Sequence, residues 1–162
     1  MDQVISSVNI NQGKKGMSAL DVNSHVFINR LADFFKTKNI IKLPKWSLLV
    51  KTSRAREIAP LSQDWFFTKA ASIARRVYVS KSHTLGIGSL KVAMGKRQRR
   101  GVQPNIARTH SGRIISEIVS QLRKGGYIEN YARDENTTLG LLLTKTGRKE
   151  LDKVASQVMN TK

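Results

Sequence analysis

The spacing of apolar residues predicts a helical first half of the chain. A first helix is expected from Asp21, as its N-cap, to about residue 37, and a short apolar element follows Pro44. A third helix is expected from Asp64 to about residue 79, because four of its apolar residues fall within one narrow sector of a helical wheel. The residues expected to face inward are Val26 or Phe27, Arg30 or Leu31, Phe34, Phe35, Trp46, Leu49, Val50, Phe66, Ala70, Ile73 and Val77.

The last third of the chain combines helical and strand patterns. A helix opened by Ser111 or Gly112 ends at the Gly125-Gly126 pair. Two strands, 127–131 and 139–143, then flank a polar loop at 132–138, and Thr144 caps a final helix. The apolar stripes of the two helices are Ile114, Ile115, Ile118, Val119, Leu122, and Leu151, Val154, Val158. This order predicts a mainly α, winged-helix-like domain with a small β-hairpin.

The chain length of 162 residues suits one domain with an extension. Residues 1–18 are polar and are expected to form a flexible N-terminal extension, and residues 19–160 a single domain. The chain has no Cys, which excludes disulfides and thiolate zinc sites. No apolar run approaches the roughly 20 residues that span a bilayer, and the N-terminus lacks the features of a signal peptide. We therefore expect no membrane partner.

Positive charge is confined to the middle of the chain. Of a formal net charge of +18, +16 lies between residues 36 and 113, where 18 Lys or Arg face two acidic residues. An ordinary soluble domain intersperses its charges, whereas a confined positive field suits a polyelectrolyte. Each phosphate that a cation neutralises releases a condensed counterion, and this release drives sequence-independent binding. The charge pattern therefore predicts a nucleic-acid partner.

The helix expected at 64–79 carries a second stripe beside its apolar face. Trp65, Lys69, Ser72 and Arg76 recur at helical spacing, with Thr68 and Arg75 flanking them. Cations, hydroxyls and an indole on one face suit contact with phosphate, sugar and bases. Trp65 alone is equally compatible with a place in the core. The polar stripe has an alternative interpretation as a solvated surface, but a functional role is favoured because the stripe belongs to the concentrated charge field.

Residues 80–113 are rich in Gly and cations. The Gly86-Ile87-Gly88 turn lacks the remainder of any phosphate-loop motif and is expected to lead into a short helix near 89–94. A basic loop follows at 95–104, and without an apolar anchor it is expected to be mobile when unbound. A nuclear-import signal is the competing interpretation of this loop. The complete set of predicted RNA-binding residues is Lys51, Arg54, Arg56, Trp65, Lys69, Arg75, Arg76, Lys96, Arg97, Arg99 and Arg100.

Several motifs together resemble a known family. They are D-W-F-F-T-K-A-A-S at 64–72, G-K-R-Q-R-R-G-V-Q-P at 95–104 and L-T-K-T-G-R at 143–148, preceded by L-P-K-W at 43–46. In this combination the chain resembles, from about residue 21 to 158, the eukaryotic and archaeal family of small-subunit ribosomal proteins numbered nineteen. Departures from the family pattern include Lys69 for Arg, Met94 for Tyr, Ser116 and Glu117 for a basic pair, and 139–142 for a G-G-R-K run.

The resemblance implies a structural protein of the head of the small ribosomal subunit. Its implied partners are small-subunit ribosomal RNA, neighbouring head proteins and assembly factors during subunit maturation. The implied location is the cytoplasmic ribosome, with nucleolar or nuclear passage during assembly if the source is eukaryotic. The resemblance implies no small-molecule substrate and no cofactor.

The residues themselves offer no basis for catalysis. His25, His83 and His110 lack metal-ligand spacing, and none belongs to a recognisable triad, so no catalytic or metal site is expected. One alternative is a winged-helix DNA-binding regulator, but the expected reading helix at 111–124 carries few cations: Arg113, Arg123 and Lys124. Another alternative is a helical adaptor that binds acidic proteins.

Overall fold

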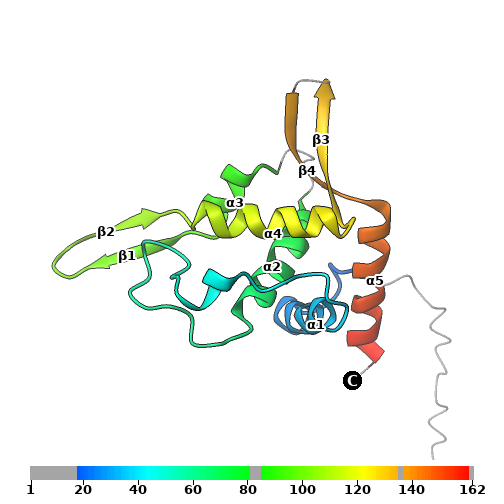
Figure 1. The fold of residues 1–162 in the computed structure, drawn as a ribbon, viewed down its shortest axis with the longest axis horizontal. Helices are drawn as coiled ribbons and strands as arrows, with labels where there is room; N and C mark the ends of the chain where they lie inside the picture. The colour runs from blue at the N-terminus through cyan, green and yellow to red at the C-terminus, as the bar shows by residue number, and fades with distance from the viewer. Residues whose placement is uncertain (1–17, 81–84, 135–136, 161–162) are drawn as a thin grey trace, which may run out of the picture.

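The structure, a computed structural model, describes residues 18–80, 85–134 and 137–160. Helices form a central body from which two β-hairpins project in different directions (Figure 1). This confirms the predicted mainly α, winged-helix-like class and adds a second hairpin to it. The elements in order are α1 (Ser24–Thr37), η1 (Lys45–Leu48), α2 (Trp65–Val79), α3 (Ile87–Ala93), β1 (Lys96–Arg100), β2 (Gln103–Arg108), α4 (Gly112–Lys124), β3 (Ile128–Asp134), β4 (Thr137–Leu143) and α5 (Lys145–Asn160).

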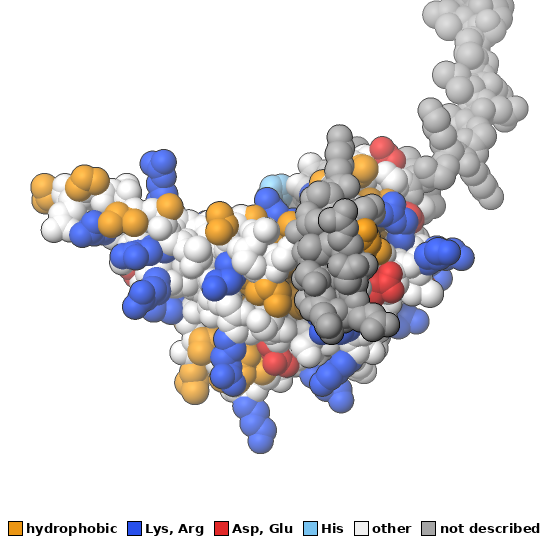
Figure 2. Space-filling model, turned by 90° about the horizontal axis from the view of Figure 1, so that it is seen from above, with side chains coloured by type: hydrophobic (Ala, Val, Ile, Leu, Met, Phe, Trp, Pro, Cys, Tyr) orange, Lys and Arg blue, Asp and Glu red, His pale blue; other side chains and the backbone are white. Residues whose placement is uncertain are grey.

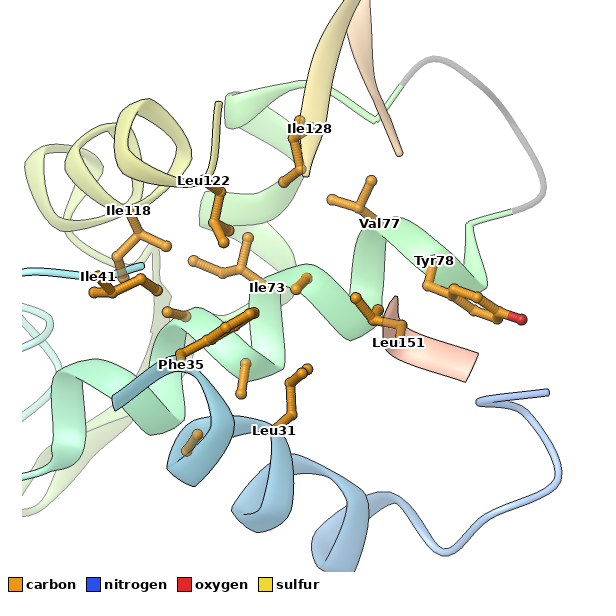
Figure 3. Close-up of a cluster of buried hydrophobic side chains, with 14 of the residues drawn as sticks. Leu31, Phe35, Ile41, Ile73, Val77, Tyr78, Ile118, Leu122, Ile128 and Leu151 are labelled. Carbon is orange, nitrogen blue, oxygen red and sulfur yellow. The ribbon is translucent and has the colours of Figure 1, made fainter. Parts of the chain in front are cut away.

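The hydrophobic core lies around α2, which packs against α1, α4 and β4 (Figure 3). Its central side chains, Phe35, Ile73, Ile118 and Leu122, come from three helices and converge without solvent exposure above 1 %. All five apolar residues predicted for α4 are buried, as are the four predicted for α2. A helix that presents such a stripe gains its stability from tertiary burial, at roughly 25 cal/mol for each Å² of apolar surface.

One predicted helix start needs correction, and one predicted cap makes a different contact. The first helix begins at Ser24, where the Asn23 side chain accepts a hydrogen bond from the backbone of His25 at 3.0 Å. Asp21, the expected cap, instead accepts hydrogen bonds from Ser18 in the preceding turn. Asp64 does occupy the N-cap position of α2, but its carboxylate makes no capping bond and pairs with Lys36 of α1 at 2.9 Å.

Of the residues expected to face inward, one is exposed, and at two points of α1 only one of the two residues that the pattern allowed is buried. At the second of these points Leu31 is buried and Arg30 is exposed. Val26 is 48 % exposed, and the inward position at that point of α1 belongs to Phe27, the other residue that the pattern allowed. Leu49 is 86 % exposed, because the short element after Pro44 is a 3₁₀ turn, which ends just before it. Trp46 within this turn and Val50 beyond it pack against the core, whereas Leu49, the C-cap of the turn, stays outside.

The wing is an antiparallel pair longer than predicted. Strand β3 continues to Asp134 and β4 begins at Thr137, so most of the expected loop at 132–138 belongs to the ladder. The inner end of the wing is tied to the body by Thr144, whose hydroxyl accepts from the backbone of Gly147 at 2.9 Å and lies 2.6 Å from the carbonyl oxygen of Gly126. Thr144 therefore caps α5, as predicted, and also joins α5 to the start of the wing.

Removing this hydroxyl should lower stability measurably. Because Thr144→Ala leaves both the helix start and the Gly126 carbonyl without their partner, we expect the free energy of unfolding to fall by about 1–2 kcal/mol. Urea unfolding followed by circular dichroism measures this, and Thr144→Ser, which keeps the hydroxyl, is the control. Equal losses in the two variants would show that the methyl group, and not the cap, stabilises this junction.

The prediction of a basic loop at 95–104 is wrong in its conformation. Residues 96–108 form an antiparallel hairpin, here called the basic arm, with Lys96 opposite Arg108 and Arg97 opposite Ala107. Gly101 adopts a φ of +64° at the turn, a region that glycine enters without steric cost. The register shifts between Gln98 and Arg100, as in a β-bulge, which bends a strand and redirects its side chains. Residues 1–17, nearly all of the predicted extension, lie outside the described residues, so its boundary stays a prediction.

Candidate nucleic-acid interface

The basic arm is anchored at its base by contacts with two other parts of the chain, the segment at Ser53 and α3. Ser53 pairs with His110 as an isolated antiparallel bridge, and its hydroxyl donates to the carbonyl oxygen of Thr109 at 3.1 Å. The backbone of His110 donates to the carbonyl of Lys91 in α3 at 2.9 Å. Beyond this base the strands are mainly exposed on both faces, so the arm projects from the body (Figure 1).

Gly95 sets where the arm leaves the body. A Cβ at this position would lie 2.5 Å from the backbone oxygen of Arg108, closer than real Cβ atoms approach, and 3.0 Å from the backbone oxygen of Val92. Only glycine therefore permits the end of α3 to pass this close to the second strand. The close approach places the cations at the start of β1 beside α2.

A hollow of about 550 Å³ opens between the arm base, the start of α2 and the segment before it. We call it the basic hollow. Five cations line it, together with the acidic residue Glu57 and the edge of Trp65. The cations are Arg56, Lys69, Lys96, Arg97 and Arg99, all of which belong to the set predicted from the sequence.

Lys69 is the innermost cation of the basic hollow. Burial lowers the pKa of its ammonium group, and the neighbouring positive charges of Arg56 and Lys96 lower this pKa further. Within the described residues its ammonium group has no acidic partner, since the one ion pair found there joins Lys36 to Asp64. A phosphate placed here would relieve both like-charge repulsions at once.

The remaining predicted residues lie outside the basic hollow. Lys51 is exposed and lines a smaller cavity with Arg113, while Arg54 and Arg76 are exposed on the surface. Arg100 lies at the end of β1, where its guanidinium donates to Gln103. Arg75 is half-buried, and its Nε finds no hydrogen-bond partner in the described part of the chain. The predicted stripe on α2 is therefore divided, with Lys69 turned into the hollow.

Trp65, for which the sequence left core and surface open, is a core residue. Its side chain is only 7 % exposed, and its ring packs edge-on against Phe66 with centroids 5.6 Å apart. Only a rim of the indole remains at the wall of the basic hollow. Trp65 can thus shape the hollow, but too little of its face is accessible for an RNA base to stack on it fully.

Sequence reasoning missed two parts of this surface. Arg108 stands on β2 opposite Lys96, but it went unnoticed because β2 was not recognised as a strand. The segment 58–61 forms an apolar wall of the basic hollow, although Ile58 and Leu61 have no helical or strand periodicity that would signal a structural role. Gly101 followed by a second run of extended residues was the available signal for the hairpin.

Side chains of one kind gather along the arm. Figure 2 shows Lys and Arg side chains spaced along it and continuing on the adjoining body, with apolar side chains at its outer end. Val102, in the turn of the arm, is completely exposed. The positive charge that is concentrated in the middle of the sequence is thus distributed along the projecting basic arm.

His110, at the arm base, is buried and faces these cations. Its Nδ1 lies 3.2 Å from the carbonyl oxygen of Ser111 and donates to it, while Nε2 has no partner among the described residues. Burial lowers the pKa of the imidazole, the hydrogen bond to Ser111 opposes this, and the charges of Lys69 and Arg56 lower the pKa further. The neutral imidazole is therefore the form that fits the folded protein.

Stability should consequently depend on pH through His110. In the unfolded chain the imidazole binds a proton near its ordinary pKa of about 6.5, whereas the folded protein resists protonation until a lower pH. The contribution of His110 to stability is complete above the pKa of the unfolded chain. It is lost as pH falls through the lower pKa of the folded protein. His110→Gln should flatten the decline in stability as pH falls below about 6.5, as urea-unfolding measurements at several pH values would show. Equal slopes in parent and variant would contradict this assignment.

The described residues contain neither a group of acidic and His side chains able to hold a metal ion nor a helix long and apolar enough to cross a membrane. Fold and surface together define a class, a mainly α, winged-helix-like protein with a basic arm and a basic hollow.

Comparison with known proteins identifies the family. The chain matches the ribosomal protein S19e family over residues 18–161 and belongs to it. It is 39 % identical over 144 residues to small ribosomal subunit protein eS19G of Ascaris suum, covering 89 % of this chain and 93 % of the relative. It is 38 % identical over 138 residues to protein eS19 of Oryza sativa subsp. japonica, covering 85 % and 90 %. This confirms the predicted family, and since that family is one of structural ribosomal proteins, the chain is not an enzyme.

Proposed function

We propose that this chain is a structural constituent of the small ribosomal subunit that binds the ribosomal RNA of that subunit. The observation that carries the proposal is the convergence of Arg56, Lys69 and Lys96 without an acidic ion-pair partner among the described residues. Such a cluster carries an electrostatic cost in the free protein, which an RNA phosphate offsets. The relatives that it matches are named as small ribosomal subunit proteins.

Each part of the surface has a distinct role in this proposal. The basic hollow binds RNA at the body of the protein, and Arg76, Arg54 and Lys51 extend the contact across the adjoining surface. Arg97, Arg99 and Arg100 on the arm reach RNA farther from the body. In the assembled subunit the chain lies in the head beside neighbouring proteins, and it takes part in subunit maturation with assembly factors. It works in the cytoplasm, with nucleolar passage during assembly if the source is eukaryotic.

Gradient sedimentation tests the proposal directly. A tagged full-length chain should sediment with the small subunit in a lysate of the source cells and stay there in moderate salt. High salt should release it, because screening weakens phosphate contacts. Recovery only at the top of the gradient would overturn the proposal. Release into complexes with acidic proteins that resist ribonuclease would favour the adaptor alternative instead.

The DNA-regulator alternative receives no support from α4. Its cations are few, and the guanidinium of Arg123 donates to Asn130 at the wing. The inner face of α4 is buried in the core, and the positive field lies on the arm and hollow instead. A reading helix needs several side chains free to reach base edges, and α4 does not offer them.

A further inference from the structure

The basic hollow contains more than a phosphate site requires. Its volume of about 550 Å³ lies within the roughly 300–1,000 Å³ of ordinary ligand pockets. A single phosphate group would fill only a small part of this space. The remaining volume is bounded by the segment 58–61 and by the rim of Trp65.

The wall at 58–61 is apolar and open to solvent. Ile58 is 68 % exposed and Leu61 is 93 % exposed, although both side chains line the hollow. Ala59 and Pro60 complete this wall. Apolar side chains gain by burial under a flat, weakly hydrated surface such as the face of a nucleobase, whereas a phosphate gives them nothing.

Glu57 is a second feature that distinguishes the basic hollow from a site for phosphate alone. It lies in the same hollow as five cations, yet it forms no ion pair among the described residues. A carboxylate repels a phosphate, but it accepts hydrogen bonds from the amino groups on base edges. A site for sugar-phosphate backbone alone would be better without it. The hollow thus joins a cationic part, an apolar wall and an acceptor, which complement the phosphate, the base face and the base edge of a nucleotide.

From this combination we propose that the basic hollow receives one unpaired nucleotide, extruded from the RNA helix that the arm grips. Its phosphate lies against Lys69 and Lys96, and its base lies against the wall at 58–61 with Glu57 at the base edge. This inference rests on the proposed RNA-binding function and adds a specific requirement to it. The protein then distinguishes RNA with a bulged or looped-out nucleotide from continuous duplex.

Two RNA hairpins test this directly, one fully paired and one identical except for a single-nucleotide bulge. The full-length protein should bind the bulged hairpin about five- to tenfold more tightly, the size of one base-stacking contribution. Ala59→Phe fills the hollow with an uncharged side chain and should abolish the preference, so that the two hairpins bind with equal affinity. Ala59 is exposed, so this replacement should not affect folding. Ala93→Phe, at an exposed alanine on α3, is the matched control and should keep the preference.

Trp65 offers an independent measurement. The chain has two Trp residues, so a Trp46→Phe background leaves Trp65 as the sole indole to report on the hollow. The bulged hairpin should change its fluorescence more than the paired hairpin does, and Ala59→Phe should remove the difference. Equal affinity for both hairpins would overturn the nucleotide site while leaving RNA binding intact. Failure to bind either hairpin would overturn the proposed function, and the nucleotide site with it.

Discussion

Replacing the four cations of β1 with glutamine is expected to weaken RNA binding more than any other surface change. Each phosphate contact contributes about 0.7–0.9 to the slope of log affinity against log salt, so losing four should reduce that slope by about three. The side chains changed are Lys96, Arg97, Arg99 and Arg100, all exposed. Because they bury no core surface, the free energy of unfolding should stay within about 0.5 kcal/mol of the parent.

A charge-matched variant separates contact from long-range attraction. The control variant removes the same net charge at positions outside the arm. It has glutamine at four exposed lysines of α4 and α5, which are Lys124, Lys145, Lys149 and Lys153. Fluorescence titrations of a short RNA hairpin at several salt concentrations should give this control the slope of the parent. If both quadruple variants lower the slope equally, the arm has no privileged contact with RNA.

Trp65→Ala is expected to be among the most destabilising single replacements in the chain. The indole is nearly fully buried against Phe66, and Phe66 also contacts Trp46 edge-on at 6.2 Å. Truncation leaves a cavity at the start of α2, and we expect a loss of about 3–5 kcal/mol of unfolding free energy. Urea unfolding monitored by far-ultraviolet circular dichroism measures this loss.

The exposed neighbour Leu61 supplies the comparison. Leu61→Ala removes an apolar side chain from the same hollow but from its solvent side, so stability should change by less than about 0.5 kcal/mol. A loss below about 1 kcal/mol for Trp65→Ala would mean that the indole contributes little packing and is available for RNA after all.

The helices with long apolar stripes could be predicted from sequence. Ile118 of α4 and Ile73 of α2 lie where a period of 3.6 residues places them, because burial against neighbouring helices requires that period. Helix ends were less certain, since Asn23 and Asp21 are equally good caps by type. Only the packing of the chain before α1 determined that Asn23 caps the helix and that Asp21 closes a turn with Ser18.

The basic arm could not be predicted as a hairpin by the same reasoning. Alternation reveals a strand when one of its faces is buried, but both faces of this arm are largely solvated. Its sequence therefore has the composition of a loop, while backbone pairing and the Gly101 turn make it a ladder. The sequence of a strand without a buried face has almost no hydrophobic alternation from which the strand could be predicted.

The sequence by itself determined the class of fold, the helical core, the family and the region that carries the charge. These properties depend on residue type, on local spacing and on recognisable motifs. Only the tertiary structure decided that Arg56, Lys69 and Lys96 meet in one hollow, that Trp65 belongs to the core, and that Glu57 lies beside the cations. Such contacts depend on how segments that are distant in the sequence pack against one another. The closure is set by long-range packing and by the close approach at Gly95, which no local pattern encodes.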